Sequence, residues 1–139
     1  MTTRASGDCV IALDTNVLLR YLLNDEPKQA ERSRALLASG SRFWVPITVM
    51  LEIAWVLRGH GADADAVALG LRTIVGLAAV TVQERDAVVR ALAWHQHGMG
   101  MADALHLALS HQSERFATFD KDFVRVAKRV DAQPAVGLP

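Results

Sequence analysis

Three carboxylates of the chain each stand alone in a segment that has no other acidic side chain and no Lys or Arg; the third segment also contains His106. They are Asp14 within residues 9–19, Glu52 within residues 43–57 and Asp103 within residues 98–110. Apolar segments of this kind tend to be buried, and burial of an unpaired charge costs several kcal/mol. Because no Lys or Arg lies in these segments, we expect the three acids to meet and to share a cation.

Two further acids follow a predicted strand near the end of the chain. Asp120 comes directly after the predicted strand 116–119, and Asp122 lies two residues beyond it. Asp14 has the same place after the predicted strand 9–13. The carboxyl ends of parallel strands meet at one edge of an open α/β sheet, where such sheets bind their ligands. We therefore expect Asp120 to join the cluster. Asp122, about 200° around a helix that starts at Asp120, should point elsewhere.

The chemistry of such a cluster is that of hard divalent cations. Carboxylate oxygens without Cys or paired His ligands select Mg²⁺ or Mn²⁺ over zinc. One or two such ions held by carboxylates activate water for in-line attack on a phosphate. The acids therefore predict a metal-dependent nuclease.

Each acid also has a local explanation that needs no metal. Asp14 and Asp120 are suitable caps for the helices that follow them. Glu52 is able to extend to solvent from its helix, and Asp103 is able to pair with His106 one turn further on. Each explanation accounts for one acid only, and the joint occurrence in charge-free segments favours the cluster.

The elements that must position these acids alternate between strands and helices. The predicted strands are residues 9–13, 43–45, 79–82, 116–119 and a weak fifth strand, 135–138. The first predicted helix follows the Asp14-Thr15-Asn16 cap. The other predicted helices cover residues 27–38, 46–58, 62–75, 84–97, 102–111 and 120–130. This order predicts an α/β fold with helices around a mainly parallel sheet. Without a linker or repeat, residues 1–139 are expected to form a single domain.

The amino-acid composition narrows the class of protein further. The chain is 51% hydrophobic and 22% charged, as globular proteins are, and its single cysteine excludes an internal disulfide. Residues 1–8 lack the apolar region of a signal peptide, and no run is long enough for a membrane span, so we expect a cytoplasmic protein. The net charge is zero, but without the five candidate acids ten acidic side chains stand against fifteen basic ones, a net +5. A mildly basic remainder suits a polyanionic substrate.

At the acidic positions the sequence closely resembles the PIN-domain family, in particular its VapC-type toxins from type II toxin–antitoxin systems. The resemblance extends from about Val10 to Gly137. It rests on ALDTNVLLRYLL with Asp14, PITVMLEIAWVL with Glu52, MADALHLALS with Asp103, and FATFDKDF with Asp120 and Asp122.

The resemblance implies a fold, an activity and a set of partners. The fold is a three-layer α/β/α sandwich with strand order 3-2-1-4-5. The activity is that of an endoribonuclease dependent on Mg²⁺ or Mn²⁺, which forms homodimers and is inhibited by a small antitoxin that covers the site. Asp14, Glu52, Asp103 and Asp120 match the family's metal-binding acids, and Asp122 is close enough to contribute. Thr15, Asn16 and Thr118 occupy matching polar positions that orient ligands or water.

A basic stripe follows Asp120. Four basic residues fall on one face of the predicted helix: Lys121, Arg125, Lys128 and Arg129. This face is either an ordinary solvated one or a phosphate-contacting surface for RNA.

Two other functions are alternatives to the nuclease. An aspartyl-nucleophile phosphatase usually needs a second Asp two residues after the first, and here Asn16 stands in that position. A non-catalytic RNA- or partner-binding module is disfavoured by the intact acidic set.

Overall fold

Residues 9–139 are described by the structure, a computed structural model; the polar stretch before Cys9 lies outside that range. The strands are β1 (Val10–Ala12), β2 (Arg42–Val45), β3 (Val80–Val82), β4 (Arg115–Ala117) and β5 (Ala135–Gly137). The helices are α1 (Thr15–Leu23), α2 (Pro27–Leu37), α3 (Ile47–Gly59), α4 (Ala64–Val75), α5 (Arg85–Gln96), α6 (Met101–Ala108) and α7 (Lys121–Arg129). Every predicted element is present, most with ends that differ by one to three residues.

The strands pair in parallel in both sheets, which confirms the α/β class. β2 lies between β1 and β3, with Phe43 opposite both Ile11 and Val80. β4 pairs with β5 in a second sheet, with Phe116 opposite Val136. The predicted order 3-2-1-4-5 is therefore present in two pieces, 3-2-1 and 4-5. It is wrong at the β1–β4 junction, because the described residues contain no pairing between these strands.

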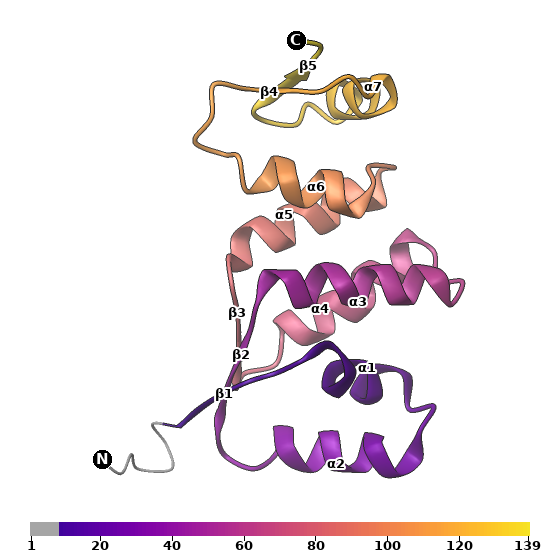
Figure 1. Cartoon of the computed structure of the whole chain (residues 1–139), viewed down its shortest axis with the longest axis vertical. Helices are drawn as coiled ribbons and strands as arrows, with labels where there is room; N and C mark the ends of the chain where they lie inside the picture. Colours follow the sequence, from indigo (N-terminus) through magenta and orange to yellow (C-terminus); the bar gives the residue numbers. More distant parts are fainter. Residues whose placement is uncertain (1–8) are drawn as a thin grey trace.

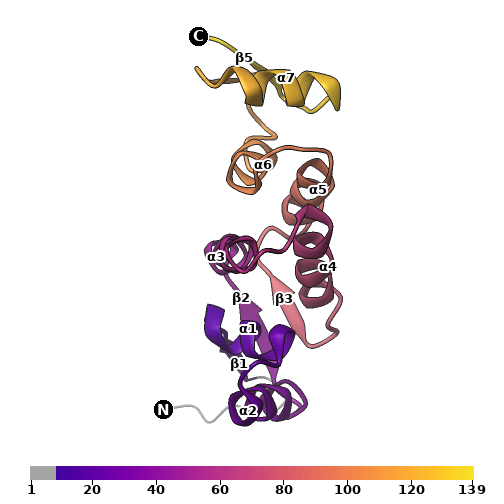
Figure 2. The ribbon, with the colours of Figure 1, turned by 90° about the vertical axis from the view of Figure 1, so that its right-hand side faces the viewer.

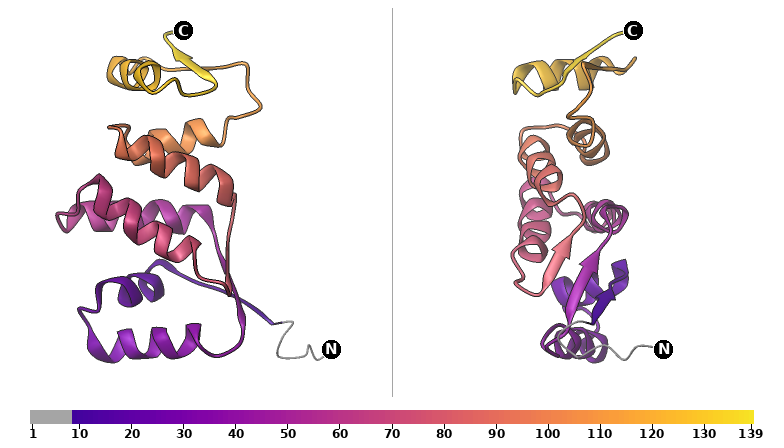
Figure 3. Two further views of the ribbon diagram at one scale, coloured as in Figure 1. Left: turned by 180° about the vertical axis from the view of Figure 1, so that it is seen from behind. Right: turned by 90° about the vertical axis from the view of Figure 1, so that its left-hand side faces the viewer.

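The molecule is extended, with its elements stacked along one axis. α2 lies at one end, the α3–α4 and α5–α6 pairs lie in the middle, and β4, β5 and α7 form the other end (Figures 1 and 2). The helices lie over one face of the β1–β2–β3 sheet, and the views from behind and from the strand side show no helix over the other face (Figure 3). The second helical layer of the predicted sandwich is thus not formed over this sheet by a single chain.

The alternation of side chains along the strands explains this one-sided cover. Phe43, Val45 and Val82 are buried beneath the helices, whereas Thr81, between the inward-facing residues of β3, is exposed. The core continues through the helix pairs, which pack by apolar side chains such as Leu18 of α1. None of the helices in residues 9–139 has both the length and the apolar character that crossing a bilayer requires.

Candidate functional site

Three of the predicted acids border one small cavity between the starts of α6 and α7. Asp103 lies in the first turn of α6, Asp122 lies in the first turn of α7, and Asp120 is the residue that caps α7. The cavity has a volume of ≈ 210 Å³. The rest of its lining comes from Gly98, Met99, Gly100, Phe123, Arg125 and Val126. Carboxylates from two distant segments of the sequence therefore meet here.

The electrostatics of the cavity are those of acids held close together. Burial raises the pKa of the Asp103 carboxyl above its ordinary value, and the negative charge of Asp120 raises this pKa further, while His106 opposes both effects. Two carboxylates that repel each other in this way favour a cation between them. Arg125 already supplies one positive charge at the rim, where its Nη2 lies 3.3 Å from Asp122 Oδ1 in an exposed ion pair.

Asp120 is held by its own backbone surroundings. Its Oδ1 accepts hydrogen bonds from the N–H groups of Asp122 and Phe123, at 3.0 and 3.1 Å. Thr118 Oγ1 in turn accepts from the N–H of Asp120 at 3.0 Å. The local explanation of Asp120 as a helix cap is therefore correct, and the cap fixes the carboxylate at the cavity. Thr118 is a positioning residue for Asp120.

Two details of the predicted loop geometry are wrong. β4 ends at Ala117, the last residue with a partner in β5, so Thr118 and Phe119 separate the strand from Asp120. Asp122 does not point away from the cavity. Because Asp120 has an extended backbone (φ −77°, ψ 103°) and precedes the helix, the rotation expected within a helix does not separate the two carboxylates.

Asp14 and Glu52 lie apart from this cavity. Asp14 is exposed and caps α1, with its Oδ1 accepting from the N–H of Thr15 at 2.8 Å. Glu52 is exposed on α3, in a groove that it shares with Thr48, Leu51, Trp55 and Ala102. Within residues 9–139 no three acidic, His or Cys side chains are arranged closely enough to hold a metal ion. A single chain thus gathers Asp103, Asp120 and Asp122, and leaves Asp14 and Glu52 outside.

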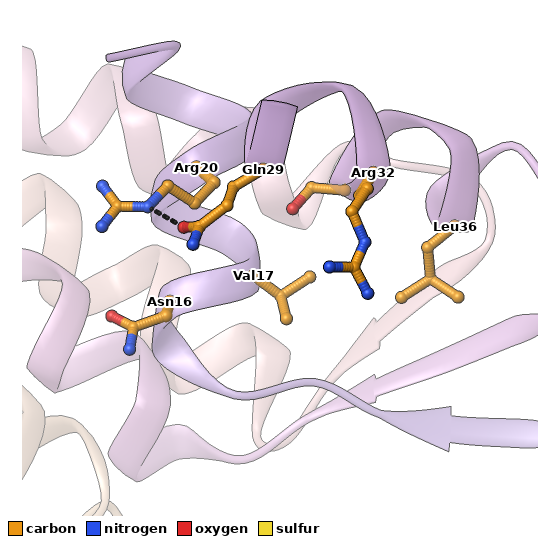
Figure 4. A pocket seen from close by; sticks show the side chains of 7 residues that line it. Asn16, Val17, Arg20, Gln29, Arg32 and Leu36 are labelled. Atoms are coloured by element: carbon orange, nitrogen blue, oxygen red, sulfur yellow. Dashed lines mark hydrogen bonds between the residues drawn. The ribbon is translucent and has the colours of Figure 1, made fainter. Parts of the chain in front are cut away.

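The two polar residues after Asp14 have different surroundings. Thr15 is buried, and its Oγ1 has no hydrogen-bond partner among the described residues. Asn16 is exposed and lines a pocket of ≈ 360 Å³ between α1 and α2, where the Nε of Arg20 donates to Gln29 Oε1 at 2.7 Å (Figure 4). Arg32 projects into the same pocket (Figure 4).

Two positioning residues were missed by the sequence analysis. Gln83 Oε1 accepts from the N–H of Ile47 at 3.0 Å and so caps the helix that carries Glu52, since Pro46 supplies no side-chain cap. The buried His95 has its Nδ1 2.7 Å from the carbonyl oxygen of Met99, which holds the turn before α6. Both contacts join residues in separate elements or turns, and no local pattern in the sequence marks them.

The basic stripe is present on the exposed face of α7, and two of its four members, Arg125 and Arg129, have partners among the described residues. The opposite face buries Phe123, Val126 and Ala127. Besides the ion pair of Arg125, the Nη2 of Arg129 donates to the carbonyl oxygen of His97 and so joins α7 to the turn before α6. Lys121 and Lys128 are exposed, and they are the members best placed to contact a phosphate.

Parallel βα units with carboxylates near strand and helix ends define a class of α/β proteins that bind ligands at such ends. Within that class, the chain matches the PIN domain family over residues 11–129, and it belongs to this family. PIN domains are commonly nucleases that act on RNA and depend on divalent metal ions. A search of curated proteins gives no match.

The carboxylates that line the cavity have the donor atoms that a divalent metal prefers, but one chain does not bring enough of them together. Their donors are carboxylate oxygens, which hard cations such as Mg²⁺ prefer, and the repulsion between Asp103 and Asp120 is of the kind that a cation relieves. The cavity of one chain, however, does not bring three carboxylates into a common coordination sphere. Asp14 and Glu52, which the sequence assigns to the same set of ligands, do not line this cavity.

Gly98 provides a test of the turn that shapes the cavity. Its φ is +107°, and a Cβ built there would lie 2.9 Å from Arg129 Nη2. We expect Gly98→Ala to lower the free energy of unfolding by about 1–3 kcal/mol, because alanine is strained at this φ. Gly59, in the last turn of α3, has open space around it, and Gly59→Ala should raise stability by about 0.4–1 kcal/mol. Urea denaturation measures both; a Gly98→Ala protein as stable as wild type would contradict the strained turn.

Proposed function

We propose that this protein is a VapC-type toxin of a type II toxin–antitoxin system, an endoribonuclease that hydrolyses RNA phosphodiester bonds with Mg²⁺ or Mn²⁺. The observation that carries the proposal is the cavity bordered by Asp103, Asp120 and Asp122 in a chain of the PIN family. Acids of this type, placed together with few compensating charges, are suited to a metal and not to folding alone.

Each residue of the acidic set has a distinct part in the proposed site. A bound divalent ion would supply activation of water. Asp103 and Asp120, and Asp122 with them, would hold the ion, while Asp14 and Glu52 complete the catalytic set. Thr118 fixes Asp120 because its Oγ1 accepts from the N–H of Asp120. Thr15 and Asn16 support the site beside Asp14.

The antitoxin part of the proposal is supported by an exposed apolar side chain near Glu52. Trp55, one turn further along α3, is 80% exposed, and Leu51 lies in the same groove. A large exposed aromatic in a groove is typical of a protein interface. A small inhibitor that inserted an apolar side chain beside Trp55 would cover Glu52 as well.

One observation favours a second candidate, a non-catalytic module that binds RNA or a partner. The acids of a single chain are divided between two places, and the described residues hold no group of three suited to a metal. Incubation of a mixed RNA pool with the protein and Mg²⁺, Mn²⁺ or EDTA separates the two candidates. Binding without cleavage in every condition would establish the module and reject the nuclease.

The acidic set predicts the outcome of conservative substitutions. Asp14→Asn, Glu52→Gln and Asp103→Asn should each reduce metal-dependent RNA cleavage by about a hundredfold or more, with non-additive losses in combination. They should also relieve growth arrest on expression. Asp86→Asn, at an exposed acid on α5 outside the set, is the matched control and should cleave as wild type does. Near-wild-type cleavage by any two of the three variants would show that the assignment is wrong.

Asp120 and Asp122 are predicted to differ in importance. Asn caps helices as well as Asp does, so Asp120→Asn keeps the cap and removes only the charge. The metal-induced stabilisation, about 2.7 kcal/mol for wild type at a hundredfold excess over Kd, should fall far more in Asp120→Asn than in Asp122→Asn. Thermal unfolding with and without Mn²⁺ measures this difference. A larger loss in Asp122→Asn would make Asp122 the main ligand of the pair.

The exposed lysines of α7 are predicted to bind phosphates. The double variant Lys121→Gln, Lys128→Gln should weaken RNA binding and flatten its dependence on salt, by about one unit of slope for each lost phosphate contact. Metal-induced stabilisation should be unchanged. Lys28→Gln on α2 is the control, since it removes a charge at the other end of the molecule. Equal salt slopes for wild type and the double variant would show that α7 is an ordinary solvated face.

A further inference from the structure

β1 and β4 each leave one edge without a partner strand. β1 pairs only with β2, and β4 pairs only with β5, among residues 9–139. Leu13 donates its N–H to Trp44 and Cys9 accepts from Arg42, so the odd-numbered residues of β1 bond towards β2. Because alternate residues of a parallel strand point their backbone groups to opposite sides, the N–H and C=O groups of Val10 and Ala12 point to the open edge.

The open edge of β4 is arranged in the same way. Thr118 donates its N–H to the carbonyl oxygen of Gly137, so the even-numbered residues bond towards β5. The backbone groups of Arg115 and Ala117 therefore point away from β5. Each open edge thus carries two residues with free hydrogen-bonding directions, on a strand of three residues that already belongs to a parallel sheet.

Both edges also expose apolar side chains. Val10 is 51% exposed and Ile11 36% exposed on β1, although Ile11 lies beside the buried Phe43. Phe119, just beyond β4, is 84% exposed. Parallel strands are normally covered, and open edges with apolar side chains tend to pair with another chain.

We propose that a second copy of this chain covers both edges: β4 of each copy pairs in parallel with β1 of the other. The two pairings are equivalent, so a two-fold symmetric dimer closes with no edge of this kind left over. The result is two sheets of order β3-β2-β1-β4-β5, each built from two chains. A second copy is the occupant that the structure favours, because the same chain carries both complementary edges.

The connection between α6 and β4 permits this exchange. Residues 109–114 form the covalent connection from α6 to the β4–β5–α7 unit, and all of them except the half-buried Ser110 are exposed. The ribbon shows this unit at the far end of the molecule from β1 (Figures 1 and 2). Within one chain this unit contacts the turn before α6 through Arg129 and the cavity lining of α7, but no strand pairing joins it to β1. An exposed connection beside an edge that lacks a partner is the arrangement found in exchanged dimers.

The exchange accounts for the divided acidic set. Asp14 follows β1 and Asp120 follows β4, and parallel pairing places the ends of both strands at one edge of the sheet. Each complete site would then combine Asp14 and Glu52 of one copy with Asp103, Asp120 and Asp122 of the other. This composite site rests on the nuclease proposed above, whereas the strand pairing does not.

The first test is the mass of the full chain in solution, measured by light scattering during size-exclusion chromatography. Wild type should have the mass of two 15.1 kDa chains. Ala12→Pro and Ala117→Pro each remove an N–H from one open edge, and each should shift the protein to the mass of one chain. Val136→Pro is the matched control, because it removes an N–H from the outer edge of β5 and should leave the dimer intact. Far-UV circular dichroism checks that the variants fold.

Two outcomes overturn the strand pairing. One is a monomeric wild type, which would show that the edges find a partner within their own chain or remain open. The other is a dimer that both folded proline variants leave unchanged, which would place the interface on another surface. A dimer that dissociates as expected but never cleaves RNA keeps the strand pairing and rejects only the nuclease.

The second test asks whether one site contains residues of two chains. Asp14→Asn and Asp120→Asn chains are unfolded together and refolded as a mixture, with each variant refolded alone as the control. Mixed dimers would hold one site with both acids and one with neither, so Mn²⁺-induced stabilisation and RNA cleavage should return, cleavage to about a quarter of wild type. No recovery in a mixture whose wild-type counterpart is dimeric and stabilised by Mn²⁺ would reject the composite site.

Discussion

Backbone pairing on both sides of β2 determines where the helices of the N-terminal half begin. β1, β2 and β3 are parallel, so their carboxyl ends lie at one edge, and α1, α3 and α5 all follow from that edge. Phe43 and Val45 fasten the middle strand to the helices above it. Asp14 at the start of α1 and Glu52 in the second turn of α3 owe their positions to this ladder. Asp120 and Asp122 follow β4, which has no backbone pairing with this ladder among residues 9–139.

The negative charges of the acidic set are compensated differently in the two places where the acids lie. Asp14 and Glu52 are exposed, so solvent screens them and folding needs no compensating charge. Asp103 is partly desolvated beside Asp120, which the raised pKa of its carboxyl reflects. His106 opposes the raised pKa of Asp103, and the N–H groups of the α7 cap stabilise the charge of Asp120. The repulsion between the carboxylates is therefore partly compensated within the protein, and a bound cation would reduce it further.

Most of the elements could be predicted from the sequence because their signals are local. Pro27 opens α2, Pro46 precedes α3, and the runs around Phe43 and Val80 have the apolar character of buried strands. The isolation of Asp103 in an apolar segment correctly indicated an acid under partial burial, whereas the same pattern was wrong for Asp14 and Glu52, which are exposed. Such patterns report which face of an element is apolar and where its backbone turns.

What could not be predicted depends on contacts between distant segments. An apolar strand such as β1 shows that it needs neighbours without showing which strand supplies them, so the break between β1 and β4 left no trace in the pattern. The position of Asp122 depends on the extended backbone of Asp120. The hydrogen bond of Arg129 depends on the turn that presents the carbonyl oxygen of His97. The cap that Gln83 provides for α3 is likewise a contact between separate elements.

The three tryptophans of the chain differ in their exposure, and this gives the molecule an intrinsic optical signal. Trp44 and Trp94 are half-buried, whereas Trp55 is almost entirely in water beside Glu52. An indole in water emits at longer wavelength than one that is shielded, so the red side of the fluorescence spectrum comes mainly from Trp55. Any molecule that settles in the groove of Glu52 will shield this indole and shift the emission to the blue. Occupancy of that groove is thereby readable in the unlabelled, unmodified chain.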